Sequence, residues 1–190
     1  MTIPNNPTSP ETPSLDWVVL VDPNDREVGV MEKMEAHRKG LLHRAFSLFI
    51  FNSSGHWLLQ QRAFDKYHSG GLWTNACCSH PRRDETTSEA VTRRLKEEMG
   101  MYCQVKPLFQ FQYRSHLDHG LIEHELDHVF MAYSDQPPRP NPSEVAAFRY
   151  IPLADLEREL SLHPERFTVW FRICFEQVKD RMKLIQLGLA

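Results

Sequence analysis

Short runs of apolar residues along the chain predict strands in its first half and its middle. The run WVVLVD, which begins at Trp17, predicts a first short strand. Residues 45–62, AFSLFIFNSSGHWLLQQR, predict two strands in a hairpin, because Ser-Ser-Gly interrupts two apolar runs. Further strands are predicted in LFQFQYR, HELDHVFMAYS and AAFRYIP, the last two separated by the proline-rich QPPRPNP. We therefore expect sheet to dominate the middle of the chain.

Two other segments have the three- to four-residue spacing of helices. In residues 87–99, with Thr87 or Ser88 as a possible N-cap and Gly100 as a stop, the apolar residues at this spacing are Ala90, Val91, Leu95 and Met99. After Pro152 the spacing becomes helical again, with Phe167, Trp170, Phe171, Cys174, Phe175 and Val178 on one face. The chain is thus expected to combine sheet and helices.

Length and composition limit how the chain is organised. With 190 residues, 41% of them hydrophobic, it is long enough for one sizeable core and short of two ordinary domains. Residues 1–16 hold four prolines and no apolar run, which predicts a flexible N-terminal tail before a single domain at residues 17–190. The net charge is -3, and no window approaches the roughly 18 consecutive apolar residues of a membrane span. We expect a cytoplasmic protein with no nucleic-acid or membrane partner.

The charges of the helix at residues 87–99 follow a recognisable spacing. Five residues separate Ser79 from Glu85, and seven more lead to RRLKEEMGM at residues 93–101. This spacing resembles the Nudix box, in which a glycine, a distant glutamate and an Arg-Glu-x-x-Glu-Glu helix hold divalent metal against a diphosphate. Ser79 stands in place of the glycine, and Arg94 in place of the first helix glutamate, so a hydrolase would lose part of its metal cluster. The alternative is a solvent-exposed helix with i,i+4 ion pairs.

A second group of carboxylates lies in EHELD, residues 123–127. Alternation along a strand places Glu123, Glu125 and Asp127 on one face and the residues between them on the other. Like charges this close raise one pKa unless a metal neutralises them or a proton is shared. The alternative is an exposed sheet face lined with acids.

Histidines and adjacent cysteines complete the candidate chemistry. His37 and His43 bracket RKGLL, and His80 ends the segment GGLWTNACCSHP. With two glutamates these histidines would make a nearly complete octahedral N3O2 site, suited to Mn2+, Mg2+, Fe2+ or Zn2+. No metal role is assigned to the other histidines, which are His56, His68, His116, His119, His124, His128 and His163. The cysteines, at positions 77, 78, 103 and 174, give no disulfide framework, so a thiol of the adjacent pair is available for chemistry.

Together these motifs resemble one family, the type I isopentenyl diphosphate isomerases. The similarity rests on EKMEAHRKGLLHRAFS, GGLWTNACCSHP, the altered Nudix helix and EHELD, and it covers residues 17–175. It implies an α/β (α+β) fold of one domain, with a Nudix-like mixed sheet flanked by helices. It also implies metal-dependent isomerisation of isopentenyl diphosphate to dimethylallyl diphosphate.

The resemblance also implies roles for individual residues. The metal ligands would be His37, His43, His80, Glu123 and Glu125, next to the thiol of Cys78. Cys78 and Glu125 would be the catalytic pair, with Tyr113 assisting the glutamate and Trp170 facing the reacting carbon. The diphosphate would be held by Lys33, Arg62, Lys66 and Arg94. Glu98 would help to bind a second ion, Mg2+, that arrives with the substrate, and no flavin is implied.

The expected chemistry explains these residue types. Moving an unactivated double bond requires protonation to a tertiary carbocation and removal of a proton from its other neighbour. Cys78 and Glu125 would supply acid and base, the resemblance favouring Glu125 as acid and Cys78 as base. The Trp170 ring would stabilise the cation and exclude water. Cys77 would then be a small packing residue, and Arg94 would bind the diphosphate without cutting it.

Two other functions remain open at this stage. One is a Nudix hydrolase acting on a nucleoside diphosphate derivative, which Arg94 argues against. The other is a non-catalytic metal-binding module on the same fold, for which Cys78 would be inert.

Overall fold

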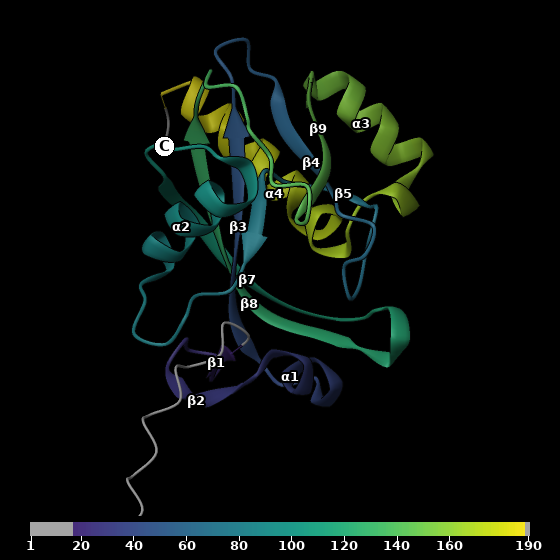
Figure 1. Cartoon of the computed structure of the whole chain (residues 1–190). Helices are drawn as coiled ribbons and strands as arrows, with labels where there is room; N and C mark the ends of the chain where they lie inside the picture. The colour runs from purple at the N-terminus through teal and green to yellow at the C-terminus, as the bar shows by residue number, and fades with distance from the viewer. Residues whose placement is uncertain (1–16, 189–190) are drawn as a thin grey trace, which may run out of the picture.

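The described chain, residues 17–188 of a computed structural model, forms one mixed sheet with helices on both faces (Figure 1). The tail predicted at residues 1–16 lies outside the described residues. The strands are β1 (Trp17–Val21), β2 (Glu27–Glu32), β3 (His43–Phe51), β4 (Trp57–Arg62), β5 (Trp73–Thr74), β6 (Cys77–Ser79), β7 (Lys106–His116), β8 (Ile122–Tyr133) and β9 (Val145–Ile151). The helices are α1 (Lys33–Lys39), α2 (Thr87–Met99), α3 (Leu153–Leu162) and α4 (Val169–Gln186).

Strand β3 lies at the centre of this sheet and determines which segments meet. One edge of β3 pairs in parallel with β8, from His43 opposite Glu125 to Phe51 opposite Tyr133. Along the other edge β3 pairs in turn with β1, β6 and β4, always antiparallel. β2 continues the sheet beyond β1, β5 and β9 pair with β4, and β7 pairs with β8. The cysteine strand β6 and the glutamate strand β8 therefore flank the same strand.

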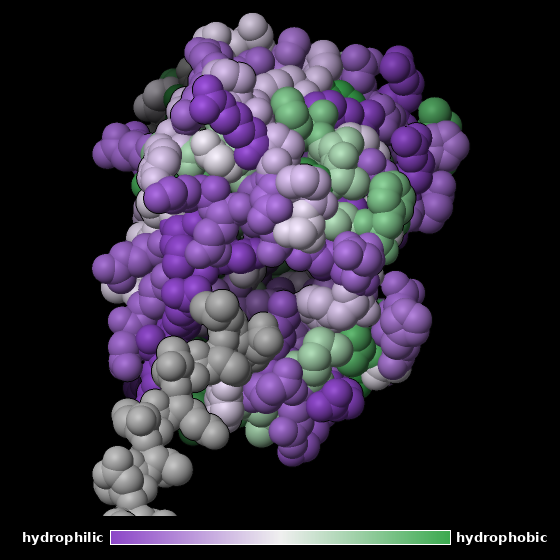
Figure 2. All heavy atoms as spheres, viewed as in Figure 1, coloured by the Kyte–Doolittle hydropathy of each residue, from purple (hydrophilic) through white to green (hydrophobic). Residues whose placement is uncertain are grey.

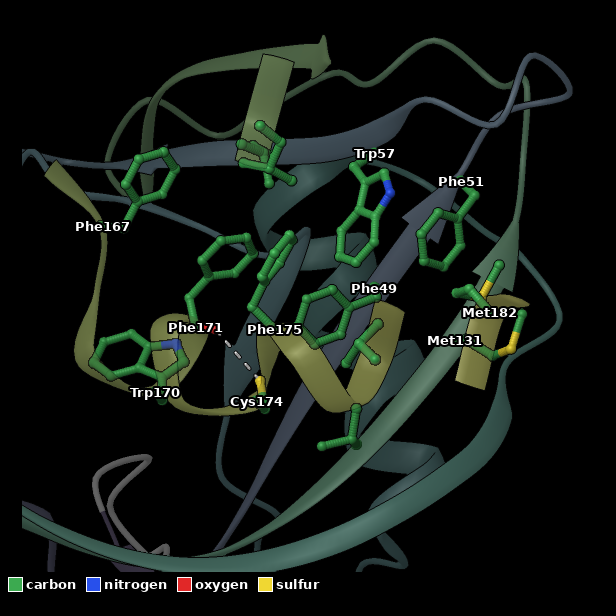
Figure 3. Close-up of a cluster of buried hydrophobic side chains, with 14 of the residues drawn as sticks. Phe49, Phe51, Trp57, Met131, Phe167, Trp170, Phe171, Cys174, Phe175 and Met182 are labelled. Carbon is green, nitrogen blue, oxygen red and sulfur yellow. Dashed lines mark hydrogen bonds between the residues drawn. The ribbon is translucent and has the colours of Figure 1, made fainter. Parts of the chain in front are cut away.

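Both faces of β3 are buried, which explains its almost continuous apolar sequence. On one face Phe49 lies in a cluster with Phe171 of α4, whose rings stack at a centroid distance of 5.8 Å (Figure 3). On the other face Leu48 lies in a cluster with Leu95 of α2. The alternating side chains of one strand thus join two separate cores, as in a sheet covered on both sides by helices. Charged and polar residues cover most of the outer face seen in Figure 2.

Helix α2 has the predicted bounds but a different N-cap. The cap is Thr86 and not Thr87 or Ser88, because Thr86 forms a capping box with Glu89: Thr86 Oγ1 accepts from the Glu89 backbone N–H, and Glu89 accepts from that of Thr86. At the other end Gly100 stops the helix at φ 62°, as expected. This geometry fixes the direction in which the charged face of α2 points.

The predicted strands and the helical stretch after Pro152 are confirmed, the latter as α3 and α4, except that Phe167 lies in extended backbone two residues before α4 begins. Four short elements were not predicted: α1, β2, β5 and β6. β5 and β6 span only two and three residues, too few for a period to show, whereas β2 and α1 span six and seven. Among the residues described, no helix has the length and apolar character needed to span a membrane.

Candidate active site

A pocket opens where β3, β6 and β8 meet the N-terminus of α4 and the charged face of α2. It is lined by Lys33, Ala45, Phe46, Ser47, Gln60, Arg62, Lys66, Tyr67, His68, Cys78, Ser79, His80, Arg94, Glu98, Glu123, Glu125, Glu144 and Trp170. Ten of the residues predicted for the site line this pocket. The remaining three, His37, His43 and Tyr113, contact its glutamates from behind. The structure therefore brings together residues from positions 33 to 170.

Three histidines and two glutamates form a compact group at the base of this pocket. Glu123 and Glu125 project from β8 on one side, as the alternation predicts, and they are 3% and 6% exposed. The exposed acidic face considered as an alternative is therefore wrong. His37 of α1 lies 3.5 Å from Glu123, and His43 and His80 lie 3.6 and 3.0 Å from Glu125. His37, His43, His80 and Glu125 place one ligand atom each within 4.8 Å of one another, which suits a shared metal ion.

Hydrogen bonds at the far ring nitrogens turn two of these histidines toward a common point. Nδ1 of His37 contacts the carbonyl oxygen of Lys33 at 2.7 Å, and Nδ1 of His43 contacts that of Leu41 at 2.8 Å. A carbonyl only accepts, so each Nδ1 carries a hydrogen, and a metal ion would be bound through the lone pair that Nε2 presents when its own proton is absent. Within residues 17–188 no hydrogen bond reaches either Nε2, although both are buried. Bare, buried nitrogens facing carboxylates fit a divalent cation.

Tyr113 joins the two glutamates. Its hydroxyl lies 2.6 Å from Oε2 of Glu125 and 2.8 Å from Oε2 of Glu123. Tyr113 on β7 is the direct cross-strand partner of Glu125, so the ladder itself sets this contact. Burial acts to raise the pKa of Glu125, but His43 and His80 outweigh it and lower that pKa well below its usual range. The glutamate is therefore ionised in the resting protein.

A third acid, Asp127, behaves differently from these two. Burial and the nearby charge of Glu125 raise the pKa of Asp127 well above its usual range. Its Oδ2 accepts a hydrogen bond from Ser47 at 2.8 Å. Of the three carboxylates expected on this face, Asp127 is therefore the one whose surroundings favour the protonated form.

The two neighbouring cysteines have separate environments, as predicted. Cys77 points into the core under α2 and is fully buried. Cys78 points into the pocket, one strand away from the glutamates. Burial raises the pKa of Cys78 to about 12, only partly opposed by Arg62. Cys78 is thus a neutral thiol in the resting site, and all four cysteines, each within the described residues, are free.

Cations gather at the mouth of the pocket above this group. The four predicted ones, Lys33, Arg62, Lys66 and Arg94, all line it. Arg94 donates to Glu98 at 2.7 Å and lies 3.3 Å from Glu144, which also pairs with Lys66. Burial acts to lower the pKa of Arg94, but nearby charges, among them Glu98 and Glu144, outweigh it and raise that pKa above its usual range. Carboxylates and cations are therefore interleaved, as a site for a diphosphate with a cation requires.

Trp170 belongs to both the core and the pocket. It lies at one end of the aromatic cluster in Figure 3, and its indole N–H donates to Thr74 at 2.9 Å. The Arg62 guanidinium lies 5.4 Å from its ring centroid. A tryptophan held this way presents a fixed aromatic face to a ligand.

Among the pocket residues that were missed from the sequence, three have titratable side chains. Tyr67 and His68 lie in the loop after β4, and Glu144 follows the proline-rich segment. His68 was among the histidines given no role, yet its Nε2 lies 3.1 Å from Glu123. Its position two residues after Lys66, in a loop already expected to bind the substrate, was the signal available.

The fold and the charged helix define a class of protein. The NUDIX domain model matches residues 41–171, so the chain belongs to the Nudix family. Solved structures have the same fold. DR0079 from Deinococcus radiodurans is 20% identical to this chain, and the match covers 77% of this chain and 90% of DR0079, with a TM-score of 0.65. The MutT protein from Methanosarcina mazei is 21% identical, and the match covers 75% of this chain and 96% of that protein, with a TM-score of 0.62. At such identities these structures show the fold alone.

Curated relatives narrow the class. The isopentenyl-diphosphate Delta-isomerase of Pectobacterium atrosepticum is 53% identical over 87% of this chain and 93% of its own length. The isomerase of Burkholderia multivorans is 49% identical over 84% and 91%, and isomerase 2 of Aromatoleum aromaticum is 47% identical over 92% and 93%. The chain therefore belongs to the isopentenyl-diphosphate Delta-isomerase family, as its motifs predicted.

Proposed function

We propose that this protein isomerises isopentenyl diphosphate to dimethylallyl diphosphate. The observation that carries the proposal is one pocket in which Cys78 and the Tyr113–Glu125 pair lie beneath a group of cations. Relatives at 47–53% identity bear the name of this activity. A small diphosphate is the substrate class, and a cytoplasmic location stays a prediction from the sequence.

We propose that His37, His43, His80, Glu123 and Glu125 hold one divalent metal ion, Mn2+, Mg2+ or Zn2+. The supporting observation is the pair of buried Nε2 atoms that face carboxylates and have no hydrogen bond within the described chain. The bound ion would fix the Glu125 carboxylate and lower its basicity. Glu98 at the pocket mouth would help to bind a second Mg2+ with the diphosphate, and no flavin is needed for this chemistry.

The diphosphate would bind among Lys33, Arg62, Lys66 and Arg94. Arg94 is the residue that would distinguish this site from that of a Nudix hydrolase. Where a Nudix hydrolase uses a helix carboxylate to hold metal, Arg94 supplies a cation that neutralises a phosphate oxygen. This arrangement binds the diphosphate and leaves its bonds intact.

Two proton transfers would follow on the hydrocarbon part. One group adds a proton to the terminal carbon of the double bond, which gives a tertiary cation, and the other removes a proton from the adjacent methylene carbon. The resemblance assigns the first step to Glu125 with Tyr113 and the second to Cys78. In the resting site the proton is on Cys78 and Glu125 is ionised. That assignment therefore requires one proton to move from the thiol side to the carboxylate as substrate binds.

Trp170 would act between these groups. The face of its ring would stabilise the carbocation, which cannot be stabilised by hydrogen bonds. The bulk of the ring would keep out water that could trap the cation. The rigid contact with Thr74 supports this role, because the ring does not need to be ordered by the substrate.

The test is an assay of reduced, metal-loaded protein with isopentenyl diphosphate and Mg2+ in heavy water. We expect an acid-labile allylic product that contains deuterium. Failure to form that product would refute isomerisation. Release of phosphate from nucleoside diphosphate derivatives would instead support the hydrolase alternative, and full activity of Cys78→Ala would support a role in which the thiol is inert.

A further inference from the structure

His68 is a fourth histidine in the site, outside the five predicted ligands. It lies in the loop between β4 and β5 and is 3% exposed. Its ring stands edge-on to Trp170 at a centroid distance of 5.9 Å and lies 5.8 Å from the ring of His37. Its Nε2 is 3.1 Å from Oε1 of Glu123, closer than the 3.5 Å between His37 and the same oxygen. The residue therefore points into the metal-binding group.

The surroundings of the His68 ring leave its Nε2 without a hydrogen bond. Nδ1 of His68 lies 3.2 Å from the hydroxyl of Ser69, a residue held in the left-handed region at φ 52°. Across residues 17–188, no hydrogen bond is formed by Nε2, which is buried. When Nδ1 donates its hydrogen to the Ser69 hydroxyl, the neutral ring directs the Nε2 lone pair at an oxygen of Glu123, which is unfavourable unless a cation lies between them.

We propose that His68 binds the metal ion through Nε2, so that the site of this chain has four imidazoles and two carboxylates. The inference rests on the proposed metal site and extends it by one ligand. His68, His37 and Glu123 place one donor atom each within 4.8 Å of one another, as required of donors that reach one ion at about 2.0–2.2 Å. His37 belongs both to this trio and to the group with His43, His80 and Glu125, which connects the two.

Two consequences follow for the metal. A fourth imidazole favours borderline ions such as Zn2+, Co2+ and Fe2+ over Mg2+, which prefers oxygen ligands. Six protein ligands also fill an octahedron and leave no position for a reactive water. The ion would then hold Glu125 in place and would not generate a nucleophile, as suits a pocket that must bind a diphosphate without hydrolysing it.

The deciding experiment counts nitrogen ligands directly. Full-length protein is stripped with a chelator and reloaded with Mn2+, and electron spin echo modulation measures the imidazole nitrogens coupled to the ion. We expect four nitrogens in the unmodified protein and three in His68→Ala, with Zn2+ bound at least about 10-fold more weakly by competition with a chelating dye. His68→Gln keeps polar volume in the loop and gives the same count if the alanine variant fails to fold.

His128→Ala is the matched control. Like His68, His128 is an imidazole that faces a carboxylate, with Nε2 3.0 Å from Asp25, but it is only partly buried and does not line the pocket. Its removal should leave four nitrogens. Three nitrogens both before and after His68 is replaced would overturn the proposal while leaving the five-ligand site intact. Failure of the unmodified protein to bind metal would overturn both.

Discussion

Replacing Tyr113 by phenylalanine tests how the two glutamates are held. The change removes one buried hydroxyl that lies 2.6 and 2.8 Å from two carboxylate oxygens and leaves the ring, which stacks on Phe111, in place. A hydrogen bond to a charged group contributes about 1.5–3 kcal/mol, and one hydroxyl proton supplies one such bond at a time. We therefore expect kcat to fall by about 10- to 150-fold, since 1.4 kcal/mol corresponds to a factor of ten.

The Michaelis constant is the internal control in this experiment. Tyr113 contacts Glu123 and Glu125 without lining the pocket itself, away from the cations that do, so KM for isopentenyl diphosphate should stay within a few-fold of its original value. The same loss of a hydrogen bond should lower Tm by about 3–12 °C in metal-free protein, because 1 kcal/mol corresponds to about 2–4 °C at this size. Loading with metal should reduce the drop, since a cation neutralises the same carboxylates.

Tyr150→Phe is the matched variant. The Tyr150 hydroxyl is buried and makes no hydrogen bond within the described residues, so its loss should leave kcat unchanged and should not lower Tm. The two rates are measured by following the acid-labile product under initial-rate conditions. A Tyr113→Phe enzyme with unchanged kcat, or one in which KM rises while kcat is constant, would refute the positioning role.

Three further changes have definite expected outcomes. Cys78→Ala should nearly abolish turnover whereas Cys77→Ala should cost stability but leave the reaction, and an active Cys78→Ala protein would disprove the assignment. Arg94→Gln removes a cation that balances two carboxylates, so KM should rise about 10-fold or more with a smaller effect on kcat, as initial rates would show. Burial acts to raise the pKa of Glu123, but its histidine neighbours lower it to about 2; this contribution to stability is present above pH 4.5 and is lost as the pH falls toward 2. Melting curves of metal-free protein at pH 6, 4 and 3 would contradict this sign if Tm rose on acidification.

Most residues of the candidate site could be predicted from the sequence, because they lie in short contiguous motifs. Glu123 and Glu125 could be placed on one face since the period of a strand is two, and the structure confirms that face. His68 and Glu144 could not be placed in this way. Each reaches the pocket from a loop, and nothing in a single sequence fixes where the backbone turns, such as the left-handed conformation of Ser69. Helix α1 was not predicted for another reason. Its seven residues span only two turns, and its N-cap is the side chain of Glu32, an unusual residue at that position.

The pairing of Tyr113 with Glu125 has a consequence for how this enzyme family can vary. Both residues belong to one antiparallel ladder, and the chain between the two strands turns outside the site, at residues 117–121. Insertions or deletions confined to that turn would leave the ladder, and with it the spacing of the two side chains, unchanged. One contact limits such changes: Asp118 in this turn accepts a hydrogen bond from the Ser69 N–H at 3.3 Å, beside His68, so a peptide tag grafted into the turn should leave Asp118 in place.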